Sequence, residues 1–252
     1  MKKSKIILLT IPALMLVSCN TKSKSDVVND IVGNNNDVSF SLTMEDGDGS
    51  SKVRELAQGQ GGVSIGFTAT VYVDGDVITK DVVSLNRVND IEWATLQHTY
   101  LNASNEEVVE NYAGAIKIDE SNNSHEVYYL NSETGEYEYY GTGYNPNFDF
   151  SFEQLEEYLT LDNAYLAAAV ALGDNGKYET LAGRRCLTFG IPGERVNLPE
   201  GRLEVSFDLE SRLLMKMHAN YIERTNDDMI IHAANVDVGS FTTAGPAPTL
   251  TK

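Results

Sequence analysis

Residues 203–221 read LEVSFDLESRLLMKMHANY, and this stretch decides the fold class. Apolar side chains alternate with polar ones in its first half, at Leu203, Val205 and Phe207. After a turn at Glu210-Ser211 a second run begins at Leu213, in which every other residue is again apolar. A period of two is typical of β-strands, because successive side chains point to opposite faces of a sheet. The stretch therefore predicts an antiparallel hairpin with one apolar face.

The same alternation recurs along most of the chain. Phe67, Ala69, Val71 and Val73 precede Asp74-Gly75-Asp76, which is a turn signal between two strands. About ten strands result, too many and too regular for a helical protein. The remaining predicted strands are Val38–Met44, Val77–Leu85, Ile91–Tyr100, Val108–Ile118, His125–Leu130, Glu136–Gly141, Tyr178–Phe189 and Met229–Phe241.

Two helices are expected to interrupt the strands. Ser151 and Gln154 have the spacing of a capping box, which predicts a helix from there to about Leu159. A second helix is predicted from Asp162, its N-cap, to Gly173, its C-terminal stop. The expected fold is a β-rich α+β fold: a strongly curved antiparallel sheet, or half-barrel, with the helical insert covering its concave face.

The N-terminus has the features of a bacterial lipoprotein. Lys2, Lys3 and Lys5 precede a short apolar segment, and Leu16-Val17-Ser18-Cys19 reads as a lipobox. The apolar segment has the length of a cleaved signal rather than of a permanent membrane span. The alternative is an ordinary signal peptide in which Cys19 is incidental. We expect residues 1–18 to be removed and Cys19 to carry the lipid, which places the protein outside the cytoplasmic membrane and anchored to it.

The remaining chain divides into three expected parts. Residues 19–37 are a polar, lipidated tether, residues 38–243 form the half-barrel domain, and residues 244–252, which contain two prolines, form a flexible tail. Apart from Cys19 the only cysteine is Cys186, so no disulfide forms within the chain. Cys186 follows Arg184 and Arg185, cations that favour a reactive thiolate, whereas burial in a strand favours an inert thiol. We expect the inert thiol.

The charge balance excludes two classes of partner. The full chain has a net charge of −18, and loss of residues 1–18 removes three lysines and no acid, which brings it to −21. Nucleic acids and anionic membrane surfaces both require basic patches. We therefore expect no nucleic-acid partner, and the lipid alone must hold the protein at the membrane.

No pattern predicts an enzyme, a cofactor or a metal site. The four histidines, His98, His125, His218 and His232, lie in separate predicted strands without the spacing of a zinc site. His218 and His232 are placed to face each other across neighbouring strands, although solvent-facing strand positions explain them more simply. Asp46-Gly47-Asp48 opens like a calcium loop, but its twelfth position is Ala57 instead of a glutamate, so an ordinary turn is the better interpretation.

Tyrosines gather around residues 131–135, the turn of a predicted hairpin. One interpretation is an aromatic surface for a glycan or a protein, because such rings offer a large contact area at a low entropic cost. The other is cross-strand aromatic pairing within the hairpin. The tyrosines are Tyr128, Tyr129, Tyr137, Tyr139, Tyr140 and Tyr144.

The order of elements resembles the lipoprotein-carrier superfamily, which includes LolA, LolB and mycobacterial LppX. The resemblance covers about two thirds of the chain, from Phe67 onward, and is carried by the strand around Gly183 and by the Phe207–Leu213 hairpin. Asp208, Leu213 and Lys216 fit the turn pattern of related members, but Ser211-Arg212 stands where Thr-Gly is usual, and Leu214 where proline is common. The resemblance implies an apolar cavity for acyl chains, and hence a lipid or lipopeptide ligand.

Two functional hypotheses follow. The first is a membrane-anchored, non-enzymatic lipoprotein that binds a hydrophobic ligand (an acyl chain, lipid or lipopeptide) in an apolar cavity. The second is a surface interaction module, filled by its own side chains, that meets a protein or glycan through the tyrosine-rich hairpin. For the first hypothesis, the predicted ligand-binding residues are Phe67, Val71, Leu203, Val205, Phe207, Leu213, Met215 and Met217.

Overall fold

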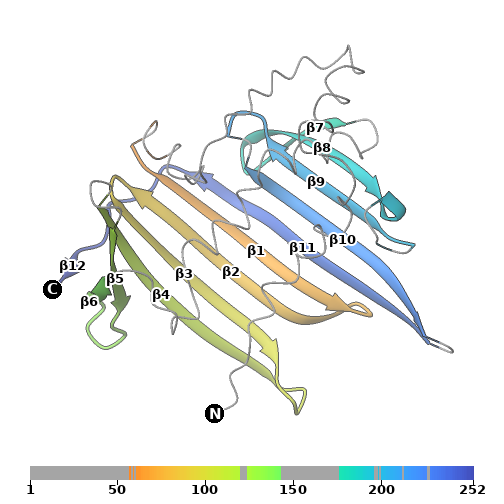
Figure 1. Cartoon of the computed structure of the whole chain (residues 1–252), viewed down its shortest axis with the longest axis horizontal. Helices are drawn as coiled ribbons and strands as arrows, with labels where there is room; N and C mark the ends of the chain where they lie inside the picture. Colours follow the sequence, from red (N-terminus) through yellow and green to blue (C-terminus); the bar gives the residue numbers. More distant parts are fainter. Residues whose placement is uncertain are drawn as a thin grey trace.

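The computed structural model describes residues 57, 59, 61–119, 124–142, 176–195, 198, 200–211, 213–225 and 228–252. They form one 12-stranded sheet (Figure 1). Its strands are β1 (Val63–Val73), β2 (Asp76–Val88), β3 (Ile91–Leu101), β4 (Glu107–Asp119), β5 (Ser124–Leu130), β6 (Tyr137–Thr142), β7 (Lys177–Leu181), β8 (Arg184–Pro192), β9 (Arg202–Asp208), β10 (Leu214–Thr225), β11 (Asp228–Thr242) and β12 (Leu250–Thr251). A single helical turn, η2 (Gly193–Arg195), connects β8 to β9.

The sheet consists of two antiparallel meanders that meet at β1. Strands β1 to β6 follow one another on one side of the meeting point, and β11 back to β7 lie on the other. β1 and β11, which are the first and the last but one of the described strands along the chain, are thus neighbours in the sheet, as Figure 1 shows. β12 adds to the free edge of β6, and this is the one parallel pairing in the described sheet.

One face of the sheet, here called the apolar face, carries the core. It contains Val63, Ile65 and Phe67 of β1, all at most 2% exposed, and continues across the sheet through their partners in β2 and β11. The strands form because every second residue finds an apolar neighbour on this face. The buried cluster draws residues from β1–β3 and β8–β11.

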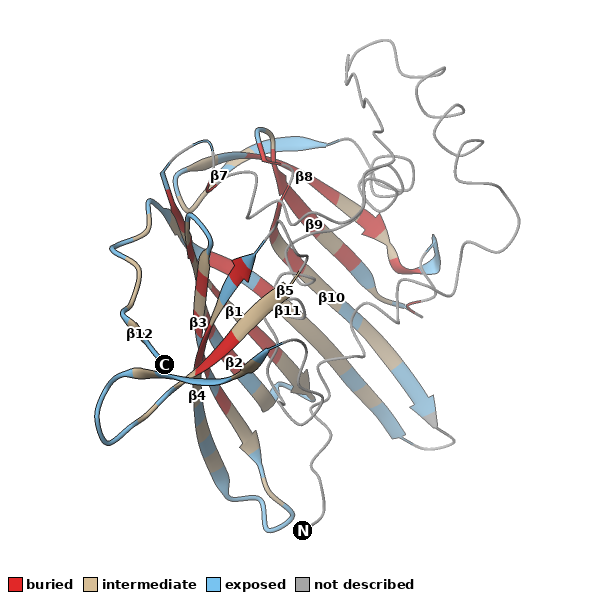
Figure 2. Ribbon diagram, turned by 60° about the vertical axis from the view of Figure 1, so that its left-hand side comes forward, coloured by how far each residue is buried: buried red, intermediate tan, exposed pale blue. Residues whose placement is uncertain are grey.

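The sheet is bent, and its burial is uneven along the strands. In Figure 2 the sheet curves between strands β2–β4 and strands β8–β10, and the buried residues concentrate toward one end of the strands. The other ends of β4 and β10 are largely exposed or half-buried. This gradient separates a packed part of the apolar face from an accessible part.

The expectation of an α+β fold is wrong. The described residues form an all-β sheet, and no helix among them lies across it; η2 spans only three residues. The buried cluster is made mainly of apolar residues from seven strands of the sheet. The helices predicted between residues 150 and 173 lie outside the described residues, as do the signal segment, Cys19, the tether and the strand predicted at Val38–Met44.

The predicted strand Tyr178–Phe189 is also wrong, because two antiparallel strands replace it. β7 and β8 are joined by Ala182 and Gly183, which have φ values of 47° and 78°. A turn with two positive φ values suits a tight hairpin, and glycine adopts it freely. Alanine seldom adopts a positive φ, so of the two turn residues only Gly183 indicated a turn in the sequence.

The other predicted strands agree with the structure to within a few residues. The hairpin of residues 203–221 is present as β9 and β10, with a bulge between Leu214 and Lys216. Because of the bulge, Leu213, Leu214 and Met215 are all buried, where strict alternation would have exposed one of them. No helix in the described part of the chain is long and apolar enough to cross a membrane.

Candidate functional site

The predicted ligand-binding residues come together on the apolar face. Phe67 is paired with Val83 on one side and Val238 on the other, and Val205 is paired with Met217 and Phe189. Seven of the eight predicted residues belong to one buried cluster and are at most 5% exposed: Phe67, Leu203, Val205, Phe207, Leu213, Met215 and Met217. These seven pack as a core.

The eighth residue, Val71, lies where the apolar face becomes accessible. It belongs to a row across the sheet in which Val71 pairs with Ala234, and Ala234 with Ala219. All three are half-buried. We call them the floor row. On either side larger residues flank it: Tyr100 beyond Thr79 in β3, and Leu203 in β9. The row thus has small side chains in its centre and larger ones at its sides.

A polar cluster lies beside the floor row, one row toward the packed core. His98 and Asp81 face each other across β3 and β2, and the row continues to Ala69 of β1. The imidazole Nδ1 lies 2.5 Å from Oδ1 of Asp81, and the ring stacks on Tyr100 with 5.1 Å between centroids. The hydrogen bond to Asp81 is the largest influence on His98 and raises its pKa, while burial opposes it.

Glu110 of β4 extends this cluster. Its two carboxylate oxygens accept hydrogen bonds from the Tyr112 hydroxyl at 2.7 Å and the Tyr100 hydroxyl at 3.4 Å. The negative charge of Glu110 also favours the protonated form of His98. The cluster therefore offers charged and hydroxyl groups next to the half-buried apolar floor row, the pattern expected for an amphiphilic ligand.

These polar residues were missed as site residues from the sequence. Asp81 is in phase with Val83 and Leu85, and His98 with Ala94 and Leu96, so strict alternation places both on the apolar face. That phase was the available signal. It does not reveal that Asp81 and His98 are partners, because the pairing depends on the register between β2 and β3.

A second polar pair is buried at the opposite end of the same strands. Arg87 and Glu92 flank the β2–β3 turn, form an ion pair, and have side chains only 1% exposed. Arg87 Nε also donates to the carbonyl oxygen of Asn89 at 2.9 Å. This pair closes the packed end of the apolar face and lies away from the floor row.

The turn residues of the sequence motif have structural roles. Asp208 accepts hydrogen bonds from Arg184 Nη2 at 2.8 Å and from the backbone N–H of Ser211 at 2.9 Å, which fixes the turn between β9 and β10. Lys216 bridges Glu179 and Glu204 at 3.0 and 2.7 Å. Burial, the largest influence, raises the pKa of Glu179, but hydrogen bonds from Thr188, Lys216 and Ser206 together outweigh it and lower the pKa to about 2.

The thiol and the other histidines form no reactive constellation. Cys186 is fully buried, and burial raises the pKa of its thiol. His218 and His232 do not face each other: His218 binds Asp237 at 2.7 Å and His232 binds Glu223 at 2.9 Å. Among the described residues, no group of three or more histidine, cysteine, aspartate or glutamate side chains is arranged to hold a metal ion.

The tyrosine hairpin consists of paired rings. Tyr128 meets Tyr139, and Tyr129 meets Tyr140, both edge to face, with centroids 5.7 and 4.5 Å apart. The cross-strand pairing interpretation is thus confirmed for these four rings. Tyr139 and Tyr140 are nevertheless 41% and 53% exposed, so part of the aromatic surface reaches solvent.

Comparison with known proteins gives coarse likenesses only. No protein-family profile matches the chain, and no curated protein matches its sequence. Among solved structures, a domain assigned to outer membrane lipoprotein sorting from Vibrio parahaemolyticus is 9% identical, with 76% of this chain and 91% of that chain covered and a TM-score of 0.25.

Two further structures are similar at the same coarse level. A β-barrel-like domain of unknown function from Brucella abortus is 12% identical, covering 73% of this chain and 98% of that chain, with a TM-score of 0.17. The MucA/MucB complex of Pseudomonas aeruginosa contains a chain that is 12% identical, covering 77% of this chain and 98% of that chain, with a TM-score of 0.12. At such TM-scores the likeness carries no argument, and the proposals below rest on the geometry of this chain.

Proposed function

We propose that this protein is a membrane-anchored, non-enzymatic lipoprotein that binds a hydrophobic ligand on the accessible part of its apolar face. The observation that carries the proposal is the floor row: Val71, Ala219 and Ala234 are apolar, adjacent and only half-buried. Apolar surface left in contact with water costs free energy, and a ligand that covers it recovers that cost.

The ligand that fits is elongated and apolar along most of its length. The row of accessible residues runs across strands, between larger side chains of β3 and β9. Each methylene group that an acyl chain buries contributes about 0.8 kcal/mol, so a chain lying along the floor row gains affinity without any polar contact. An acyl chain, a lipid or the acyl part of a lipopeptide meets this description.

The polar cluster supports an amphiphile over a plain hydrocarbon. His98, Asp81 and Glu110 lie beside the floor row, and a polar head at that point keeps access to hydrogen-bonding groups. If the polar head were buried without such partners, the cost of removing it from water would cancel the free energy gained by burying the acyl chain. The cluster thus favours ligands whose polar group sits at one end.

Membrane anchoring follows from the N-terminal sequence, which lies outside the described residues. The basic start, short apolar segment and Cys19 support lipid attachment on the extracytoplasmic side of the membrane. A protein anchored to the membrane is close to hydrophobic ligands, because the bilayer contains them.

A second function is supported by the tyrosine hairpin. The exposed parts of Tyr139 and Tyr140 are consistent with an interaction module that contacts a protein or glycan. The two proposals differ in one measurable respect. Only the ligand-binding protein, purified under native conditions, should release a lipid in stoichiometric amount on organic extraction and mass spectrometry; an empty extract, together with no uptake of added fatty acid, would favour the interaction module.

A further inference from the structure

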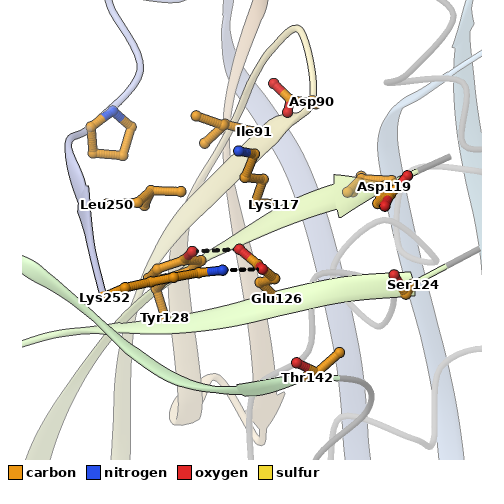
Figure 3. Close-up of a pocket in the computed structure, with 12 residues that line it drawn as sticks. Asp90, Ile91, Lys117, Asp119, Ser124, Glu126, Tyr128, Thr142, Leu250 and Lys252 are labelled. Atoms are coloured by element: carbon orange, nitrogen blue, oxygen red, sulfur yellow. Dashed lines mark hydrogen bonds and ion pairs between the residues drawn. The ribbon is translucent and has the colours of Figure 1, made fainter. Parts of the chain in front are cut away.

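A hollow lies on the face of the sheet opposite the apolar face. It has a volume of about 980 Å³ and lies between strands β3–β6 and the C-terminal segment that crosses them (Figure 3). Lys117, Glu126 and Tyr128 line it from the sheet, and Leu250 and Lys252 line it from the C-terminal segment. The ligand-binding proposal does not use this hollow, and the tyrosine hairpin of the second proposal borders it through Tyr128.

The C-terminal segment already occupies part of this site as an extended peptide. Leu250 and Thr251 pair in parallel with Tyr137 and Glu138 of β6. Two residues after Leu250, the ammonium group of Lys252 binds the carboxylate of Glu126, as Figure 3 shows. The chain's own segment thus indicates what this site binds: an extended backbone with an apolar residue and, two positions later, a lysine.

The ammonium position is built from three groups. Glu126 provides the carboxylate, which also accepts a hydrogen bond from the Tyr128 hydroxyl at 2.7 Å. The ring centroid of Tyr139 lies 5.4 Å from the Lys252 nitrogen, within the range of a cation–π contact. Asp90 and Asp119 also line the hollow, so its carboxylates outnumber its one sheet-borne cation, Lys117. The surroundings favour a cationic occupant.

The chain's own segment is a small occupant that is held at few points. β12 is two residues long, and residues 243–249 before it form no regular secondary structure. In the described structure β6 pairs with β12 only through Tyr137 and Glu138, although β6 continues to Thr142. A strand edge of this kind is a common docking place for an extended peptide.

We propose that this site binds an extended segment of a partner protein, in which an apolar residue is followed two positions later by a lysine, in place of residues 250–252. The unfilled volume distinguishes a partner from a second copy of this chain. A copy would insert the same Leu250 and Lys252 and leave the same 980 Å³ hollow, whereas a partner with larger side chains fills it.

The test uses the full chain in mild detergent and a fluorescent peptide, PAPTLTK, which reproduces residues 246–252. Leu250→Ser/Lys252→Gln empties the site without shortening the chain, and we expect this variant to bind the peptide more tightly than the wild type does. A peptide with phenylalanine at the leucine position should bind more tightly still. A peptide with glutamine for lysine should bind about tenfold more weakly, because it loses a charged hydrogen bond.

Two protein variants complete the experiment. Glu126→Gln should weaken peptide binding about tenfold, whereas Glu133→Gln, at the exposed turn of the same hairpin, should leave binding unchanged. The proposal is overturned if the emptied variant binds no peptide, if the glutamine peptide binds as well as the lysine peptide, or if the wild type is a dimer that Leu250→Ser/Lys252→Gln dissociates. That last result would identify a second copy as the occupant.

Discussion

His98 and Asp81 are partners across two strands of the apolar face, with Nδ1 of the imidazole 2.5 Å from Oδ1 of the carboxylate. Their side chains are only 11% and 10% exposed. The hydrogen bond to Asp81 raises the pKa of His98 above its ordinary value of 6.5. The sheet therefore holds a titratable pair next to the proposed ligand site, and the aspartate favours protonation of the imidazole.

This pair predicts a pH-dependent stability. Because the folded-state pKa of His98 is raised, its stabilising contribution is fully present below pH 6.5 and is lost as the pH rises through the folded-state pKa. We expect the difference in urea midpoint between the wild type and His98→Gln to be larger near about pH 6 than near about pH 9. The matched control is His218→Gln, which removes a more exposed contact between histidine and Asp237. A His98 difference that does not change with pH would contradict the prediction.

The buried pair Arg87–Glu92 predicts a large cost for breaking it. Each side chain is 1% exposed, so removal of one partner takes this ion pair away from a charge that stays buried. Arg87→Met should lower the free energy of unfolding by about 3–5 kcal/mol, measured by urea denaturation. Arg87→Met/Glu92→Leu removes both charges and should be more stable than the single variant. A double variant less stable than Arg87→Met would refute this account.

The hairpin of residues 203–221 was predictable because apolar and polar residues alternate in its first strand, where Leu203, Val205 and Phe207 are buried, although Ser206 and Asp208 are buried as well. The Ala182–Gly183 turn was not, since alanine seldom adopts the positive φ that it has there. The fold class was predicted incorrectly because capping patterns at residues 151–173 were taken to mean that helices bury the sheet. Among the described residues the buried cluster comes mainly from seven strands, and no helix lies across it.

The candidate site was predictable in part. Period two correctly placed Phe67, Val205 and Met217 on one face, but it did not distinguish the packed core from the accessible floor row. That difference depends on how far the sheet bends. β12 gave no periodic signal, because only Leu250 and Thr251 pair with β6, and a two-residue strand is too short to display a period.

Cys186 should be an unreactive thiol. It is fully buried, and burial raises the pKa of the thiol, so little thiolate forms at neutral pH. We expect labelling of the native protein by a maleimide, measured on the Cys19→Ser background by mass spectrometry, to be slow and to become fast in urea. Rapid labelling without denaturant would show that this strand opens or that the thiol is activated.

Cys19→Ser should abolish lipid attachment, because a serine hydroxyl cannot form the thioether on which lipoprotein processing depends. The variant should fail to incorporate a palmitate analogue and should move from the detergent phase to the aqueous phase on phase separation. Ser23→Thr keeps both the thiol and the lipobox and serves as the control, which should still be labelled. Continued labelling of Cys19→Ser would disprove the lipoprotein assignment.

The central claim concerns the floor row, and neighbouring alanines of β11 test it. Ala234 lies in the floor row, and Ala233 points to the opposite face; both are half-buried. A tryptophan at position 234 fills the space proposed for an acyl chain, whereas a tryptophan at position 233 adds the same bulk outside it. Matched urea midpoints for the two variants show that both sheets remain folded.

The most direct measurement is the titration of a fluorescent fatty acid into the Cys19→Ser protein and into its Ala234→Trp and Ala233→Trp derivatives. We expect the parent and Ala233→Trp to bind with Kd values within about twofold of each other, and Ala234→Trp to bind at least about tenfold more weakly, a loss of about 1.4 kcal/mol. Equal binding by all three proteins, or no binding by the parent, would contradict the claim that the apolar face holds a hydrophobic ligand.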